Sequence, residues 1–76
     1  MNDLFPDAKA MTRMERQALA EFKAARAAGK PWGRKRIVSM QGCEEAGYVT
    51  RVLKNGMTAG WELTPAGATW SPPADL

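Results

Sequence analysis

Apolar residues near the start of the chain recur at the spacing of an α-helix. They fall three or four positions apart, with charged and polar residues between them, so that on a helix they share one face. This apolar stripe comprises Met11, Met14, Ala18, Leu19, Phe22 and Ala25. We expect it to form the core of the domain, and its alternative role is a face that binds a partner.

Local signals mark both ends of this helix. Thr12, followed three positions later by Glu15, fits the capping box, in which the Thr hydroxyl accepts from the Glu15 amide and the carboxylate reaches back. Good helix formers continue as far as Ala28, and a glycine and a proline then follow. The sequence therefore predicts a helix over residues 13–28.

The next segment, after a turn over residues 30–33, supports two interpretations. Apolar residues recur in it at helical spacing, at Ile37, Met40 and Cys43. This spacing, with Gly47 as a terminator, predicts a second helix over residues 34–46. However, Gly42 weakens a helix by about 1 kcal/mol relative to Ala, and β-branched residues make a strand over residues 35–40 the alternative. We favour the helix.

A hairpin is predicted by Asn55-Gly56, because both residues tolerate the positive φ angles of a type I′ turn. A two-residue loop pairs Lys54 with Met57 and sets the register of residues 48–63. The face expected to point toward the core then carries Tyr48, Thr50, Val52, Ala59, Trp61 and Leu63. The opposite face carries Val49, Arg51 and Leu53, so that Arg51 points to solvent while Lys54 and Asn55 occupy the tip.

The remaining segments complete the predicted organisation. Thr64 and Pro65 suit the cap and the first position of a short helix. We expect an irregular arm over residues 1–11, one domain over residues 12–70 and a flexible tail over residues 71–76. The predicted class is α+β, with two helices before a two-stranded hairpin. The alternative is one helix packed on a three-stranded antiparallel sheet.

Charge indicates an anionic partner without requiring one. The 76 residues include 11 Lys and Arg against 8 Asp and Glu, a formal net charge of +3. Four basic residues fall within seven positions, at Lys30, Arg34, Lys35 and Arg36. Such clustering is typical of surfaces that bind polyanions. No apolar run approaches the roughly 20 residues of a spanning helix, and the polar N-terminus does not resemble a signal peptide, so we expect a cytoplasmic protein without a membrane partner.

The residues that most often carry catalysis are scarce. The chain has no histidine and a single cysteine, Cys43, which excludes an internal disulfide and leaves no Ser/His, Cys/His or multi-cysteine metal constellation. Glu44 and Glu45 are adjacent and would point in different directions on a helix. We therefore expect no catalysis, no cofactor and no metal, with Cys43 as a small buried hydrophobic residue.

Two phrases carry a resemblance to a known family. Residues 44–49 read EEAGYV, and residues 61–67 read WELTPAG after the Gly-containing hairpin. Together they resemble the wing region of winged helix-turn-helix DNA-binding domains, over about residues 37–67. Such a domain has three helices before its wing, whereas this chain has two. The resemblance therefore implies either a reduced winged-helix-like domain that completes its core as a homodimer, or that residues 34–46 are not a recognition helix.

The resemblance implies a regulator that occupies a site on double-stranded DNA. Its recognition helix would enter the major groove, with Arg34, Lys35, Ser39 and Gln41 contacting bases. Arg36 would contact phosphate, and the wing residues Arg51, Lys54 and Asn55 would contact the backbone or the minor groove. The tryptophans, Trp32, Trp61 and Trp70, are expected in the core, with stacking on bases as the alternative. The rival function is a protein–protein interaction module that covers an acidic surface of a larger protein.

Overall fold

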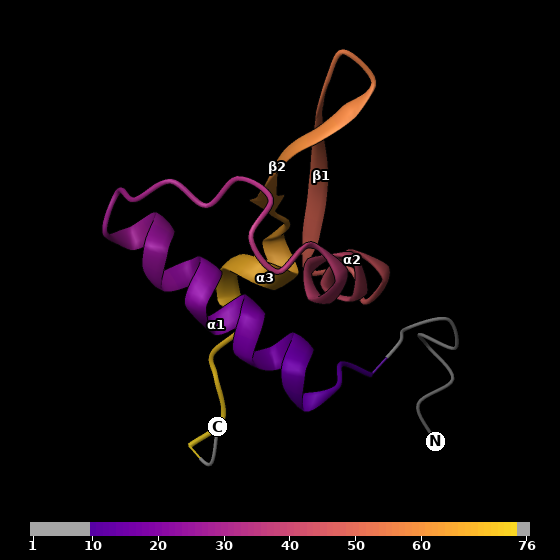
Figure 1. Cartoon of the computed structure of the whole chain (residues 1–76). Coiled ribbons are helices and arrows are strands. Elements are labelled where there is room, and N and C mark those ends of the chain that lie inside the picture. Colours follow the sequence, from indigo (N-terminus) through magenta and orange to yellow (C-terminus); the bar gives the residue numbers. More distant parts are fainter. Residues whose placement is uncertain (1–9, 75–76) are drawn as a thin grey trace.

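Two helices precede a hairpin and a short helix in the computed structural model, which describes residues 10–74 (Figure 1). The elements are α1 (Arg13–Ala27), α2 (Ile37–Glu45), β1 (Val49–Lys54), β2 (Met57–Leu63) and α3 (Pro65–Thr69). The chain is therefore α+β, as predicted, and its order of elements is consistent with a reduced winged-helix-like arrangement. Within the described residues the sheet has two strands, which excludes the alternative of one helix on three strands.

The capping box that begins α1 is present as predicted. The Glu15 amide donates to Thr12 Oγ1 at 3.2 Å, and the Thr12 amide donates to Glu15 Oε1 at 3.0 Å. The helix ends at Ala27, one residue before the predicted end, because Gly29 adopts a left-handed φ of 70°. The chain then turns, and the Lys30 amide donates back to the Ala25 carbonyl oxygen at 2.8 Å.

The second helix begins three residues later than predicted. Arg36, at its N-cap, has φ 52° and ψ 44°, a left-handed conformation that a right-handed helix cannot include. Helical geometry therefore starts at Ile37, and Arg34, Lys35 and Arg36 lie in the loop that leads into α2. Residues 37–45 are helical, so the alternative strand over residues 35–40 is also wrong.

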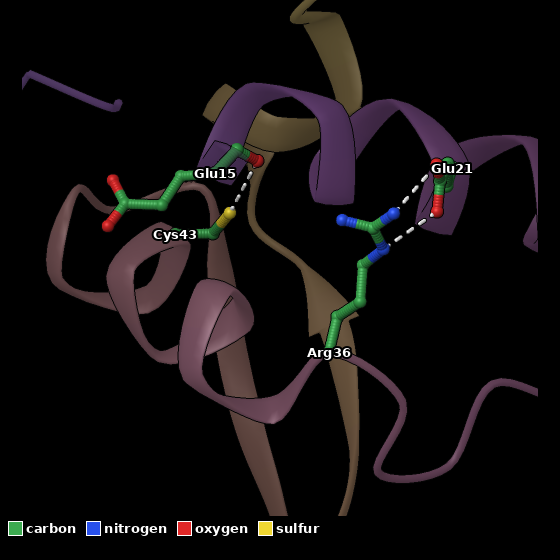
Figure 2. A network of polar contacts seen from close by, with 4 residues as sticks. All are labelled: Glu15, Glu21, Arg36 and Cys43. Atoms are coloured by element: carbon green, nitrogen blue, oxygen red, sulfur yellow. Dashed lines mark hydrogen bonds and ion pairs between the residues drawn. The ribbon is translucent and has the colours of Figure 1, made fainter. Parts of the chain in front are cut away.

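Gly42 lies where α2 packs against the start of α1. A Cβ atom at this position would stand 2.0 Å from Glu15 Oε2, and the capping box holds that carboxylate in place. The neighbouring Cys43 is buried as predicted, and its Sγ donates to the Glu15 carbonyl oxygen at 3.3 Å (Figure 2). The residue that weakens α2 as an isolated helix is therefore the residue that allows it to pack on α1.

The hairpin has the predicted turn, but the predicted register holds only for the two residue pairs next to that turn. Asn55 and Gly56 have φ angles of 54° and 76°, and Lys54 pairs with Met57. Beyond the next pair the register shifts, so that Val52 pairs with Gly60 and the intervening Ala59 is an extra residue on β2. The pairings predicted closer to the body of the domain are therefore wrong by one residue.

This β-bulge reverses the face that β1 presents to the core. Val49 is 1% exposed and Trp61 is 4% exposed, so both point inward. Thr50 and Val52, which were expected to face the core, are exposed, while Tyr48 is half-buried. A shift of one residue moves every side chain of a strand to its other face. The bulge accommodates this shift and allows both of the bulky residues, one from each strand, to fill the core.

The core lies where α1, α2 and the base of the hairpin meet. It contains Ala18, Leu19, Phe22, Met40, Cys43, Val49 and Trp61. The apolar stripe of α1 is therefore core, as expected, apart from Met14, which is 57% exposed. Trp32 packs edge-on against Phe22 with ring centroids 5.6 Å apart, and Trp70 packs against Tyr48 at 6.4 Å. All three tryptophans belong to the core or border it.

Hydrogen bonds that involve the side chains of Thr64 and Lys23 hold the two ends of the short helix α3. Thr64 Oγ1 accepts from the Gly67 amide at 3.1 Å, and Pro65 occupies the first helical position, as predicted. At the other end, Lys23 of α1 donates to the carbonyl oxygens of Gly67, Ala68 and Trp70. A cation at the C-terminus of a helix satisfies carbonyls that the helix itself leaves unpaired. Lys23 therefore joins α3 to α1.

The two ends of the chain lie largely outside the described residues. Of the predicted arm over residues 1–11, only residues 10 and 11 are described, and Met11 packs against the core. Of the predicted tail, residues 71–74 are described, and Pro72 and Pro73 form a shallow groove with Gln17, Ala20 and Glu21 of α1. Between residues 10 and 74 no helix has the length and apolar character needed to cross a membrane.

Candidate nucleic-acid interface

The described part of the chain is more basic than the chain as a whole. Residues 10–74 include ten of the eleven Lys and Arg residues but five of the eight acidic ones. None of the charged residues in this range is buried, so their charges lie at the surface. What matters for binding an anion is which of these cations are already paired with carboxylates.

Arg34 and Lys35 are exposed cations in the α1–α2 loop, which also carries Lys30 and Arg36. Lys35 Nζ lies 5.0 Å from the centroid of the Trp32 ring, within the range of a cation–π contact. Because Trp32 also packs against Phe22, the core holds this part of the loop in place. Arg34 makes no hydrogen bond or ion pair with any residue between 10 and 74. Both side chains can therefore contact an anion without losing a carboxylate partner.

Arg36 turns back toward α1 instead of outward. Its Nε lies 3.0 Å from Glu21 Oε1, and its Nη2 donates to Glu21 Oε2 at 3.3 Å, so the guanidinium engages both carboxylate oxygens (Figure 2). The Arg36 side chain is 34% exposed and that of Glu21 is 51% exposed. A contact between Arg36 and phosphate, which the resemblance implies, would require this two-point ion pair to open.

Arg51 also joins two elements. Its Nη2 donates to Glu44 Oε1 of α2 at 2.9 Å, and its guanidinium lies 5.4 Å from the centroid of the Trp61 ring. Arg51 is exposed, as predicted. It pairs with Trp61 across the strands, however, so it lies on the core-side face of the hairpin and not on the opposite face, where it was expected. The cause is the β-bulge, which shifts β1 by one residue against β2, so that Arg51 and not Thr50 pairs with Trp61.

The helix α2 turns one face inward and one outward. Met40, Gly42 and Cys43 are buried, whereas Val38 is 76% exposed. The predicted base-contacting residues Ser39 and Gln41 are both half-buried. Val38 is not among the residues predicted to contact DNA. On a helix whose inward stripe is formed by Ile37, Met40 and Cys43, position 38 falls on the side opposite that stripe.

The hairpin projects from the helical body (Figure 1), and its tip carries both a basic residue and large apolar residues. Lys54 and Asn55 are exposed there, as predicted. Beside them, Leu53 is 60% exposed and Met57 is 59% exposed. The loop before α2 and the hairpin lie on the same side of α1 in both figures. No hydrogen bond or ion pair between described residues joins the loop cations to the hairpin tip. The structure therefore presents two separate basic points, the loop with Arg34 and Lys35 and the tip with Lys54.

The carboxylate partners of the two arginines were missed by the sequence analysis. Glu21 lies 15 positions from Arg36, and Glu44 lies 7 positions from Arg51. Neither separation is a spacing that predicts contact within one helix or across a tight turn. Both ion pairs arise from the packing of different elements, so no local pattern in the sequence indicates them.

Comparisons of the chain with known protein families, with curated proteins and with solved structures found no match. Among residues 10–74, no group of three His, Cys, Asp or Glu side chains is arranged to hold a metal ion. The features of this chain that bear on its function are therefore the positions and the pairing of its basic side chains.

Proposed function

We propose that this protein binds double-stranded DNA and regulates by occupying its site, without catalysis. The observation that carries the proposal is the pair of basic points, the loop with Arg34 and Lys35 and the projecting tip with Lys54, on one side of α1. The order of two helices followed by a hairpin, which the winged-helix resemblance led us to expect, supports it. A projecting hairpin beside a helix of suitable width is a common way to contact two grooves of a duplex.

The ion pairs divide the five basic residues of the predicted DNA interface into two groups. Arg34, Lys35 and Lys54 have no carboxylate partner among residues 10–74 and contact phosphates. Arg36 and Arg51 instead hold the loop against α1 and the hairpin against α2. They position the interface and contribute less to the attraction of the duplex, because their charges are already partly compensated.

The outward face of α2 supplies contacts with bases. An α-helix is about 10–12 Å across with its side chains, which matches the roughly 12 Å width of the major groove. Val38 is placed to contact the methyl group of thymine, and Gln41 retains enough exposure to reach an adenine edge. Ser39 lies beside them on the same helix, half-buried, and its hydroxyl offers a further hydrogen bond.

The proposal is tested by measuring the affinity for a labelled 30-bp duplex from about 50 mM salt upward, since low salt favours phosphate contacts. Three phosphate contacts predict that log K falls with log salt with a slope of roughly −3. Arg34→Ala should weaken binding. Arg13→Ala is the matched control, because Arg13 is an exposed arginine in the first turn of α1, away from the loop. The number of protein chains bound to each duplex tests whether the protein binds DNA as a homodimer.

The same ion pairs favour a second candidate function, that of a protein–protein interaction module. Glu21 and Glu44 each accept hydrogen bonds from a guanidinium group on this surface, and arginine–carboxylate pairing is the chemistry of docking on an acidic protein. Absence of duplex binding at about 50 mM salt would contradict the DNA proposal. Partner capture from the native host that survives nuclease treatment and requires Arg34 and Lys35 would then support the protein–protein interaction module.

A further inference from the structure

The exposed apolar side chains at the hairpin tip have no role in the core. The core takes Val49 and Trp61 from the base of the hairpin, whereas Leu53 and Met57 lie at its far end and are 60% and 59% exposed. Single exposed apolar side chains are ordinary on protein surfaces, but here two large ones stand together at the end of one projecting element, where the core of the domain cannot use them.

The arrangement of these side chains is that of a wedge. Residues that pair across antiparallel strands share a face, so Met57 lies on the face of Lys54, and Leu53 lies on the opposite face with Thr58. Each face of the tip therefore presents one large apolar side chain. Between residues 52 and 60 the only charged residue is Lys54, so this wedge carries a positive charge and no negative one.

We infer that the hairpin tip enters the minor groove of the bound duplex, where Leu53 and Met57 partly unstack a base step and bend the DNA. Inserted Leu and Met side chains act in this way in proteins that bend DNA through the minor groove. The positive charge of Lys54 complements the phosphates on both sides of the groove. The inference rests on the proposed function, because it requires a bound duplex.

The hairpin is too wide for the minor groove of a straight duplex, so the DNA must bend if the hairpin is to enter it. Adjacent strands lie about 4.8 Å apart before side chains are added, and the minor groove of a straight duplex is only about 6 Å wide. The hairpin therefore fits only if the groove widens, and unstacking a base step widens it. Asn55 offers hydrogen bonds to acceptors on the groove floor, and Gly56 adds no side chain at the leading edge of the tip.

The inference is tested by measuring DNA bending and affinity on the same sample. The probe is a mixed-sequence 40-bp duplex with a fluorescence donor and acceptor at its ends and 2-aminopurine at internal steps. Wild-type protein should bend it by roughly 20–90° and raise the 2-aminopurine emission. The Leu53→Ala/Met57→Ala variant should lose both signals while its affinity falls by less than about tenfold.

Two further variants separate bending from binding. Met57→Lys adds a positive charge at the tip, so it should hold or raise affinity at low salt and still reduce bending. Met14→Ala is the matched control, because Met14 on α1 is 57% exposed, almost the same as Met57. It should leave bending and affinity unchanged. Circular dichroism before each titration verifies that every variant is folded.

The outcomes distinguish the inference from the proposed function. Binding without bending, or equal bending by wild type and the Leu53→Ala/Met57→Ala variant, overturns the wedge and leaves the DNA proposal standing. Failure to bind any duplex overturns both. If the double substitution converts a dimer into a monomer in the absence of DNA and leaves bending unchanged, the tip joins two copies of the chain, and the wedge is again overturned.

Discussion

The ammonium group of Lys23 lies 2.8 Å from the carbonyl oxygen of Gly67, joining residues that are 44 positions apart. Gly67 is buried, and a Cβ atom there would stand 2.0 Å from the Tyr48 carbonyl oxygen. The backbone of α3 therefore presses against the start of β1 while Lys23 holds its carbonyl end.

Replacing Lys23 with Met should destabilise the protein by about 1.5–3 kcal/mol, the range for hydrogen bonds that involve a charged group. Met keeps most of the apolar stem of the side chain but cannot donate to the α3 carbonyls. Urea denaturation followed by circular dichroism measures the change. Lys30→Met, in the exposed loop after α1, should change stability by less than about 0.5 kcal/mol. Equal effects of the two substitutions would argue against the contact between Lys23 and α3.

Gly42→Ala should destabilise the protein, although helix propensity alone predicts a gain of about 1 kcal/mol. The added Cβ displaces the Glu15 carboxylate and breaks a capping box worth on the order of 1 kcal/mol, besides crowding the α1–α2 contact. In a Glu15→Ala background the clash is absent, so the same change should become neutral or stabilising. A thermal-melt double-mutant cycle measures this reversal, and additive effects would contradict the predicted close approach.

Val49→Ala should cost about 2 kcal/mol through the loss of buried apolar surface and the resulting cavity. Thr50→Ala, one position along the same strand, should stay within about 0.5 kcal/mol because Thr50 is exposed. Chemical denaturation of the two variants compares the register that contains the β-bulge with the uninterrupted register. A larger loss from Thr50→Ala than from Val49→Ala would support the uninterrupted register.

Lys54→Ala and Arg51→Ala should affect DNA binding differently. Loss of Lys54 removes one phosphate contact, so the slope of log K against log salt should become shallower by roughly one unit, with all sequences weakened alike. Arg51 is paired with Glu44, so Arg51→Ala should change the slope less. It should instead cost up to about 1 kcal/mol of stability through the lost ion pair and cation–π contact. Salt titrations with both variants measure the slopes, and identical slopes would mean that Arg51 contacts phosphate directly.

The features that the sequence predicts correctly depend on neighbouring residues. Thr12 and Glu15 complete a capping box within one turn, and Asn55-Gly56 forms its turn from the φ preferences of those two residues. The start of α2 was placed too early because Arg36 adopts a left-handed conformation that non-glycine residues rarely take. The side chain of Arg36 reaches Glu21 on another helix, and no local pattern reveals that partner.

In the candidate site, too, the sequence predicted what neighbouring residues determine and missed what the packing of distant elements determines. Lys54 and Asn55 are exposed at the tip, because the turn alone places them there. The environment of Arg51 depends on the β-bulge at Ala59, and alternation along a strand does not reveal an extra residue. The bulge is favoured because Val49 and Trp61 both gain burial, which is a property of the assembled core. Sequence patterns therefore identified the tip of the hairpin and misplaced its base.

The distribution of the core along the chain has a consequence for how the protein folds. The buried residues of α1 find their partners at Met40, Val49 and Trp61, so α1 is not fully covered until Trp61, more than thirty residues after the end of α1, has been synthesised. An isolated helix of 15 residues is marginal in water, and a lone two-stranded hairpin is no more stable. Neither half of the chain is an independent folding unit. Ordering should therefore occur in a single cooperative transition after most of the domain has left the ribosome.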